Sequence, residues 1–256
     1  MHFLTKLAWR DSIALLTLDD GTGRNALSLQ MRSELDEQLQ HLLGDKVCSA
    51  IVLTGAENFC FGGDLRQMDV KTRQEALSRL ELVHRIIRQV ASSAKPVLTA
   101  VQGIAAGGGV SLVAGSDYAV AARTARFSGS FLRAGLIPDM GALATVSRRM
   151  GMARARQFFC LGTTLSASDA FAAGLVDQVV EPPDVLDTTV AIAEQMAALP
   201  PLAFSAFKAA FADHSASLGQ ALEAEKHFQP GLLTSQDQKE AVTAFLDKRR
   251  PVFTGS

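Results

Sequence analysis

The sequence has no excess of charge of either sign, since 25 lysine and arginine residues are balanced by 26 aspartate and glutamate residues. No long block of one sign occurs along the chain. A field that would attract nucleic acid or an anionic membrane surface is therefore not expected. We predict a small-molecule partner, with neither nucleic acid nor a membrane as a partner.

Cysteine and long apolar runs are also scarce. Cys48, Cys60 and Cys160 are odd in number, widely spaced and without a C-x-x-C pair, so neither a disulfide framework nor a thiolate metal site is indicated. The opening MHFLTKLAWR has no basic region before a long apolar run, and about 18 consecutive apolar residues occur nowhere. We expect a reducing compartment and, most simply, a cytoplasmic location.

The five histidines show no pairing at i, i+4 or across a short loop that would suit a metal ion. They are His2, His41, His84, His214 and His227. A lone histidine in a helical pattern is more often packed or exposed than a ligand. We therefore assign no metal.

The first part of the chain alternates between short strands and longer helices. Residues 12–20 form a run rich in Ile and Leu that ends at glycines. Residues 28–43 carry leucines at helical spacing, and residues 49–55 form a second apolar run. Together these patterns predict a β-α-β opening.

The alternation continues, beginning at a capping box formed by Thr72 and Glu75. A helix, a strand, a helix behind three glycines and a further strand are predicted at 73–93, 95–103, 110–116 and 117–124. From about residue 142, alanine-rich helical patterns dominate to the end. Strands separated by helices favour parallel pairing. The sequence therefore predicts an α/β fold with mostly parallel strands and an α-helical C-terminal part.

One motif suggests a dinucleotide site. GTGRNA, from Gly21 to Ala26, fits G-x-G-x-x-A between a strand and a helix. However, Asp19 and Asp20 immediately before the turn would lie close to a pyrophosphate. No acid stands at a strand end at the expected distance of about 20 residues. These details disfavour the dinucleotide alternative.

Two glycine turns at strand ends suggest a different chemistry. Gly62 and Gly63 follow one predicted strand, and Gly107 to Gly109 follow another. Glycine allows tight turns and close packing of backbones, so a purely structural role is the alternative. Peptide N–H groups exposed at two such turns can converge on a carbonyl oxygen and stabilise an enolate, each contributing roughly 3 kcal/mol to lowering the barrier.

Six segments in chain order resemble the enoyl-CoA hydratase/isomerase, or crotonase, superfamily. They are RNALS (24–28), FCFGGDL (59–65), AVQGIAAGGGVSLVAGSD (100–117), ARFSGSFLRAGLIPDMG (125–141), SASDAFAAGLVDQVV (166–180) and AFLDKRRPVF (244–253). The resemblance covers nearly the whole chain. It implies a crotonase-like spiral of repeated β-β-α turns, with a core at 1–195 and a C-terminal helical trimerisation region at 196–256. It also implies trimers or hexamers that bind acyl-CoA, with coenzyme A carried as part of the substrate and no separate cofactor.

The resemblance also assigns roles to individual residues. The oxyanion hole falls on the amides of Gly63, where the family often has Ala, and Gly108. Coenzyme A should lie along the RNAL turn and the GGDLR segment. The residues implied to contact substrate are Arg24, Ala26, Asp64, Leu65, Arg66, Phe245 and Lys248. Guanidinium groups match phosphate oxygens, so Arg24 and Arg66 are the expected phosphate contacts, with a solvated surface role as the alternative. Asp64 is expected to hold the turn that presents the Gly63 amide.

Hydratases of this family carry two glutamates, at places held here by Ser111 and Phe131. Neither residue can activate water or supply a proton, so the usual hydration route is not expected. Moving a double bond requires one base, and Asp139 lies where several family isomerases place their acid/base aspartate. Apolar neighbours such as Phe131 and Met140 are expected to raise its pKa. The alternatives are that Asp139 caps a helix beginning near Gly141, or that the motif persists without activity.

Several other interpretations stay open. Phe61, Phe131, Leu132 and Met140 suggest an apolar acyl pocket, although core packing would explain them equally. Ser128, Ser130 and Cys60 lie near the expected pocket, which leaves covalent catalysis as an alternative. The expected function is enoyl-CoA isomerisation by Asp139. Hydrolysis, carbon–carbon cleavage and coenzyme A binding without turnover are the alternatives.

Overall fold

The computed structural model describes residues 3–212 and 218–256. The strands are β1 Thr5–Arg10, β2 Ile13–Leu18, β3 Ala50–Gly55, β4 Val97–Val101, β5 Ile104–Ala106, β6 Tyr118–Ala122, β7 Arg126–Ser128, β8 Thr164–Ser166 and β9 Gln178–Val180. The helices are α1 Leu29–Gly44, α2 Arg73–Ala91, α3 Gly108–Gly115, α4 Ala142–Met150, α5 Met152–Leu161, α6 Ala167–Ala172, α7 Val185–Ala197, α8 Pro201–Ala212, α9 Leu218–Leu233 and α10 Gln236–Leu246. Short 3₁₀ helices are η1 Leu65–Gln67, η2 Ser130–Ala134 and η3 Pro182–Asp184.

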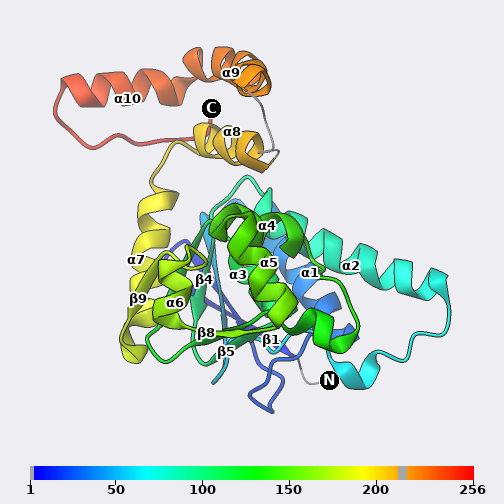
Figure 1. Cartoon of the computed structure of the whole chain (residues 1–256). Helices are drawn as coiled ribbons and strands as arrows, with labels where there is room; N and C mark the ends of the chain where they lie inside the picture. Colours follow the sequence, from blue (N-terminus) through cyan, green and yellow to red (C-terminus); the bar gives the residue numbers. More distant parts are fainter. Residues whose placement is uncertain (1–2, 213–217) are drawn as a thin grey trace.

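Two sheets form the core of the fold (Figure 1). The larger has the strand order β1-β2-β3-β4-β6-β9, in which β1 is antiparallel to β2 and the remaining pairs are parallel. The smaller has the order β5-β7-β8, with one parallel and one antiparallel pair. The predicted α/β class and the mostly parallel pairing are therefore confirmed.

Burial explains why the central strands read as continuous apolar runs. Every residue of β3 and β4 is buried, as expected for parallel strands covered on both faces. Helix α1 begins where Ser28 accepts a hydrogen bond from the amide of Met31, and Leu35, Leu39 and Leu42 are buried on its inner face. Helix α7 packs against β3, β4 and β6. These layers fix the strand ends from which the glycine turns leave.

Some elements differ from the sequence-based expectation. Strand β1 precedes the predicted opening, and β8 and β9 lie in the part expected to be helical. The helix expected at 73–93 ends at Ala91. Thr72 does cap it by accepting from the amide of Glu75, but the Glu75 carboxylate accepts from the amide of Lys71 and so does not complete the capping box.

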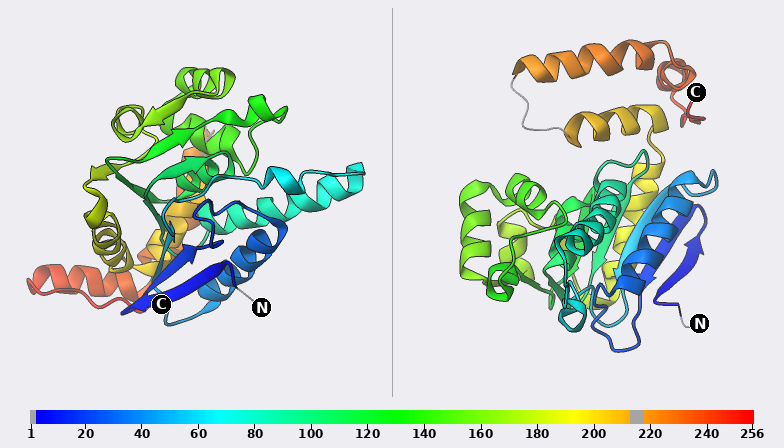
Figure 2. Two further views of the ribbon diagram at one scale, coloured as in Figure 1. Left: turned by 90° about the horizontal axis from the view of Figure 1, so that it is seen from below. Right: turned by 90° about the vertical axis from the view of Figure 1, so that its right-hand side faces the viewer.

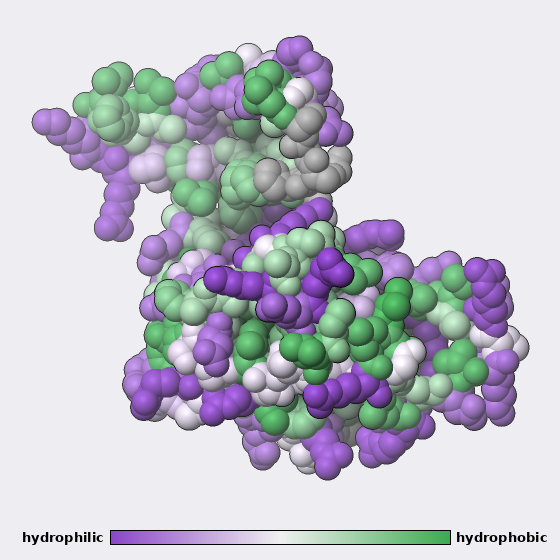
Figure 3. Space-filling model, in the orientation of Figure 1, coloured by the Kyte–Doolittle hydropathy of each residue, from purple (hydrophilic) through white to green (hydrophobic). Residues whose placement is uncertain are grey.

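The last three helices extend away from the sheets (Figures 1 and 2). The boundary predicted between residues 195 and 196 falls within the last turn of α7. Figure 3 shows apolar surface over this C-terminal part. Its exposed apolar side chains include Leu202, Phe207, Phe211, Leu222, Leu233 and Phe245. The division into two regions, and trimerisation by the second, remain predictions.

Among the described residues, no single helix has the length and apolar composition to cross a membrane. The segments Pro182–Ala197 and Pro201–Phe211 reach the required length and apolar composition only when they are taken together, and the pair is bent by 106°. The first of them contains α7, which packs against the central sheet.

Candidate active site

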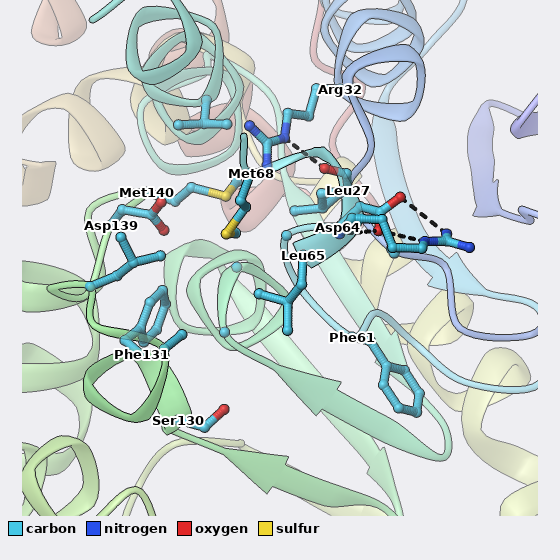
Figure 4. A pocket seen from close by; sticks show the side chains of 18 of the residues that line it. Leu27, Arg32, Phe61, Asp64, Leu65, Met68, Ser130, Phe131, Asp139 and Met140 are labelled. Atoms are coloured by element: carbon cyan, nitrogen blue, oxygen red, sulfur yellow. Dashed lines mark hydrogen bonds and ion pairs between the residues drawn. The ribbon is translucent and has the colours of Figure 1, made fainter. Parts of the chain in front are cut away.

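A cavity of about 290 Å³ opens where the two glycine turns meet (Figure 4). Its walls come from residues 24–27, 61–68 and 130–140 and from the start of α3, with one residue each from α1 and α2. Of the residues expected in the site, Gly63, Gly108 and Asp139 line it, as do Arg24, Ala26, Asp64, Leu65, Arg66 and Phe131. The structure therefore brings the predicted catalytic groups together in one cavity.

The two turns pack against each other through Gly62. Its φ is +82°, and a Cβ added there would lie 2.6 Å from the carbonyl oxygen of Ala106 and 3.0 Å from the nitrogen of Gly108. Only glycine permits both this backbone conformation and this approach. Gly62 thereby places the neighbouring residue, Gly63, beside the start of α3.

Both expected oxyanion-hole amides are available for a ligand. Among the described residues, no hydrogen bond is donated by the backbone N–H of Gly63 or of Gly108. Gly108 is the first residue of α3, so its N–H has no acceptor within the helix. The positive end of the helix dipole also favours negative charge at this point. The site can therefore stabilise an oxyanion on a ligand.

Asp139 is a half-buried acid at one end of this cavity. Burial raises its pKa above the ordinary value of 3.8, against the opposing effects of the Arg32 and His84 charges. Its alternative role as a helix cap is wrong, because the N-cap of α4 is Gly141 and no side chain of the described residues, including that of Asp139, caps that helix. A carboxyl group with a raised pKa that faces a cavity is suited to exchange protons with a ligand.

The residues at the two glutamate places have other roles. Ser111 is buried and its hydroxyl donates to the backbone carbonyl of Asp139 over 3.1 Å. Phe131 lines the cavity and packs edge-on against Phe159, with ring centroids 6.0 Å apart. The carboxylates that line this cavity are those of Asp64 and Asp139.

Asp64 is already engaged by its own turn. Its carboxylate accepts from the Nε and Nη2 atoms of Arg66 over 2.9 and 3.1 Å and from the backbone amide of that residue. The hydrogen bonds from Arg66 lower the pKa of Asp64. The expected turn-holding role of Asp64 is consistent with these bonds, while the phosphate contacts of Arg24 and Arg66 remain predictions.

Three of the residues expected at the pocket, Leu132, Phe245 and Lys248, are not among those that line the cavity of this subunit. Leu132 is 46% exposed on η2, whereas Phe61 and Met140 do line the cavity. Phe245 and Lys248 lie at the end of α10 and just beyond it, in the part that extends away from the core (Figure 1). Their contact with coenzyme A depends on a neighbouring subunit and remains a prediction.

Covalent catalysis by Cys60 is not supported. Complete burial raises the pKa of its thiol to about 12, so the reactive thiolate is not populated near neutral pH. Its sulfur instead accepts from the backbone amide of Gly62 over 3.3 Å. Ser130 lines the cavity, but no described histidine does. Ser128 contributes its backbone carbonyl, which accepts from the amide of Gly107.

The dinucleotide alternative is wrong. The carboxylates of Asp19 and Asp20 accept from the amides of Gly21, Thr22 and Ala26, which a pyrophosphate would need. Helix α1 begins only at Leu29, beyond the turn. Hydrogen bonds within the protein therefore close this loop.

Metal-ligand spacing is also absent from the described residues, which hold no group of three or more His, Cys, Asp or Glu side chains suited to a metal ion. His2 and His214, weighed above as ligands, lie outside the described residues.

Arg32 and Met68 belong to the site but were not anticipated. Arg32 lies in the first turns of α1, among leucines at helical spacing, and its side chain reaches the cavity. Met68 follows η1 and contacts the space beside Gly63. A single arginine on an amphipathic helix resembles an ordinary surface residue, so no local signal identifies it.

Comparison with known proteins gives a consistent picture. The enoyl-CoA hydratase/isomerase family model matches residues 9–256. An Escherichia coli (strain K12) protein named 1,2-epoxyphenylacetyl-CoA isomerase is 35% identical over 249 residues, with 95% of both chains covered. A probable enoyl-CoA hydratase of Rhodobacter capsulatus is 37% identical over 247 residues, covering 96% of this chain and 95% of that one.

Solved structures agree in fold. A crystal structure of an enoyl-CoA hydratase from Polaromonas superposes with a TM-score of 0.91 at 30% identity, covering 98% of this chain and 99% of that one. An enoyl-CoA hydratase from Bacillus anthracis gives a TM-score of 0.92 at 27% identity, covering 99% and 100%. The expected crotonase fold is thus confirmed, and the chain belongs to the enoyl-CoA hydratase/isomerase family.

Proposed function

We propose that this protein is an enoyl-CoA double-bond isomerase with Asp139 as its acid/base. The observation that carries the proposal is the composition of the cavity. Two glycine amides that have no acceptor in the described part of the chain share it with one acid whose pKa is raised. Ser111 and Phe131 stand where the usual hydration route needs glutamates. One base can serve isomerisation, whereas hydration needs a group for water and another for the proton.

The reaction follows from these three groups. The thioester oxygen of a 3-enoyl-CoA accepts from the amides of Gly63 and Gly108. The Asp139 carboxylate takes a proton from carbon 2, and the electrons of that C–H bond form the enolate, whose charge lies on the thioester oxygen. The thioester carbonyl then re-forms, the double bond moves to carbons 2 and 3, and carbon 4 recovers the proton from Asp139. Each amide is expected to lower the activation barrier for enolate formation by about 3 kcal/mol.

The names of similar proteins support an acyl-CoA reaction and include both activities. The Escherichia coli relative is named as an isomerase of an acyl-CoA, whereas the Rhodobacter relative is named as a probable hydratase. The absence of both family glutamates favours the isomerase. We further propose a cytoplasmic homotrimer or hexamer that uses acyl-CoA and needs no separate cofactor.

The proposal is tested by incubating the protein with a 3-enoyl-CoA and following the conjugated product by absorbance. Asp139→Asn is expected to reduce turnover by about 100- to 10,000-fold, because the base is lost. Asp184→Asn, which alters an exposed acid of η3, is the matched control and should retain turnover. Turnover of Asp139→Asn equal to that of the wild type would rule out the proton shuttle, and release of free coenzyme A would indicate hydrolysis instead.

A further inference from the structure

A second cavity of about 250 Å³ continues from the first beyond Asp139. It lies between α1, η1, α2 and residues 136–139. Arg32 and Asp139 line both cavities, so they stand where the two join. Figure 4 shows them at the end of the pocket away from Phe61 and Ser130. An acyl chain that enters past Gly63 and Gly108 would pass this junction.

Arg32 has unused hydrogen-bonding capacity. Its Nε donates to the carbonyl oxygen of Leu27 over 2.7 Å. Among the described residues, its two Nη groups have no hydrogen-bond acceptor, and no carboxylate lies within the 4.0 Å of an ion pair. One of them, Nη2, lies 3.3 Å from where a Cβ on Gly63 would be. The guanidinium therefore stands beside one of the expected oxyanion-hole residues.

Two other charged side chains around the second cavity are already engaged. Arg79 donates to the carbonyl oxygen of Gln67 and to the carboxylate of Glu75. Asp64 is held by Arg66. Most of the remaining wall is apolar, including Leu29, Val70, Leu80, Val83, Leu136 and Ile137. A few placed donors in an apolar pocket orient a ligand. Of the two arginines that line this cavity, Arg32 is the one whose Nη groups have no acceptor among the described residues.

We infer that Arg32 selects acyl groups that carry a neutral oxygen, such as a hydroxyl, carbonyl or ring-ether oxygen, beyond the reacting carbons. Such an oxygen can accept from the Nη groups of Arg32 while Asp139 keeps its own charge. A carboxylate there would add a second negative charge near Asp139 and hinder its ionisation. The inference rests on the proposed function for the direction in which the acyl chain runs.

Binding of unreactive ligands tests this inference without any turnover. Hexanoyl-CoA is compared by calorimetry with hydroxyhexanoyl-CoAs that carry the hydroxyl at each carbon beyond carbon 3. We expect at least one hydroxylated ligand to bind the wild type about ten-fold tighter, the effect of one hydrogen bond to a charged donor. Arg32→Met should abolish this preference. Arg79→Met removes a guanidinium that is already engaged within the protein, and this variant should keep the preference for the hydroxylated ligand.

The outcomes separate the possibilities. Equal affinity of the wild type for all ligands would overturn the inference. An Arg32→Met variant whose affinity falls by the same factor for hexanoyl-CoA and for every hydroxylated ligand would also overturn it. Tighter binding of a terminally carboxylated hexanoyl-CoA than of every hydroxylated ligand would overturn the choice of a neutral oxygen. Arg32→Lys keeps a charged donor and should retain part of the preference, which allows the test even if Arg32→Met does not fold. Failure of the 3-enoyl-CoA assay alone would count against the proposed reaction, not against the role of Arg32.

Discussion

Ser111, at a position where the family resemblance places a hydratase glutamate, donates a hydrogen bond to the backbone of Asp139. Its hydroxyl is the side-chain donor to the backbone carbonyl of Asp139, at a point where the chain turns sharply. Met140 follows with a φ of +49°, a conformation that is uncommon for residues other than glycine. The hydrogen bond from Ser111 therefore helps to hold a strained turn that aims the Asp139 side chain.

Ser111→Ala should lower kcat by about two- to ten-fold, with a smaller effect on KM, because one hydrogen bond of about 0.5–1.5 kcal/mol no longer orients Asp139. Steady-state kinetics with a 3-enoyl-CoA measure this. Ser78→Ala, which removes an exposed hydroxyl of α2, is the control. Unchanged kcat in Ser111→Ala would mean that the hydroxyl does not position the acid.

Gly62 and Gly63 offer a second comparison at this scale. A Cβ on Gly62 meets the backbone of Ala106 at 2.6 Å, whereas a Cβ on Gly63 meets only the flexible ends of Met68 at 2.7 Å and Arg32 at 3.3 Å. Gly62→Ala should misplace an oxyanion donor and lower kcat by about 100-fold or more. Gly63→Ala should remain active. Similar kcat values for the two variants would show that the contact of the turns does not set the oxyanion hole.

The raised pKa of Asp139 predicts opposite effects on activity and stability. The folded protein holds the proton more tightly than the unfolded chain, so ionisation of Asp139 opposes folding. At pH 7, Asp139→Asn should have a larger free energy of unfolding than the wild type. This advantage should shrink as pH falls through the folded-state pKa and vanish below the ordinary value of 3.8.

Urea unfolding at several pH values measures the effect of Asp139→Asn. In the wild type, kcat/KM should fall as pH is lowered through the same raised pKa, because the base must be ionised. An Asp139→Asn variant that is less stable than the wild type at pH 7 would contradict the prediction that the ionised Asp139 carboxylate, although needed for activity, destabilises the folded protein.

At the scale of elements, local sequence patterns were sufficient to predict those strands in which nearly every residue is buried. Strands β2, β3 and β4 were anticipated because short, continuous apolar runs mark them directly. Strands β5, β7 and β8 have three residues each, too few to form a pattern, and depend on distant partners. Tertiary pairing decides such short strands.

The site divides in the same way. The positions of Gly63, Gly108 and Asp139 were anticipated because each lies within a contiguous motif. Arg32 was not, because its role depends on how α1 lies against the turn at residues 61–68. The sequence identified Ser111 only as a residue in place of a glutamate. Its hydrogen bond to the backbone of Asp139 was not anticipated, because the two residues lie far apart in the chain.

Helix α8 is joined to the core by an ion pair between buried Lys208 and half-buried Asp117. Lys208 is 4% exposed, and its Nζ contacts the carboxylate of Asp117 at 2.6 Å, the hydroxyl of Ser93 at 2.9 Å and the carbonyl of Lys95 at 3.1 Å. Burial raises the pKa of Asp117 and lowers that of Lys208, so each charge depends on the other. This pair ties the C-terminal region to the sheet.

Lys208→Met should lower the free energy of unfolding by about 3 kcal/mol, because the half-buried Asp117 carboxylate loses its ion-pair partner and keeps only the hydrogen bond from the Val97 amide. Asp117→Asn combined with Lys208→Met should recover part of the loss. Lys226→Met, which breaks an exposed pair with Glu223 on α9, should have little effect. Urea unfolding followed by circular dichroism measures all three, and a Lys208→Met variant as stable as the wild type would exclude α8 anchoring by this pair.

For the whole molecule, the exposed apolar surface of the C-terminal helices requires an explanation. Phe207 and Phe211 on α8 are 56% and 52% exposed, with ring centroids 4.5 Å apart. Contiguous apolar surface of this kind marks an interface more often than a solvated face. The expected homotrimer or hexamer would cover it, and would bring the end of α10 of one subunit towards the cavity of another.

The double variant Phe207→Asp/Phe211→Asp should therefore reduce the mass of the assembly, because two charges cannot be buried in an apolar interface without loss of affinity. Light scattering coupled to size-exclusion chromatography measures the mass, and circular dichroism checks that the core stays folded. Phe171→Asp, which changes an apolar residue of α6 that is 54% exposed on the core, is the matched control and should leave the mass unchanged. A wild-type protein that runs as a monomer, or a double variant with wild-type mass, would show that α8 does not mediate assembly.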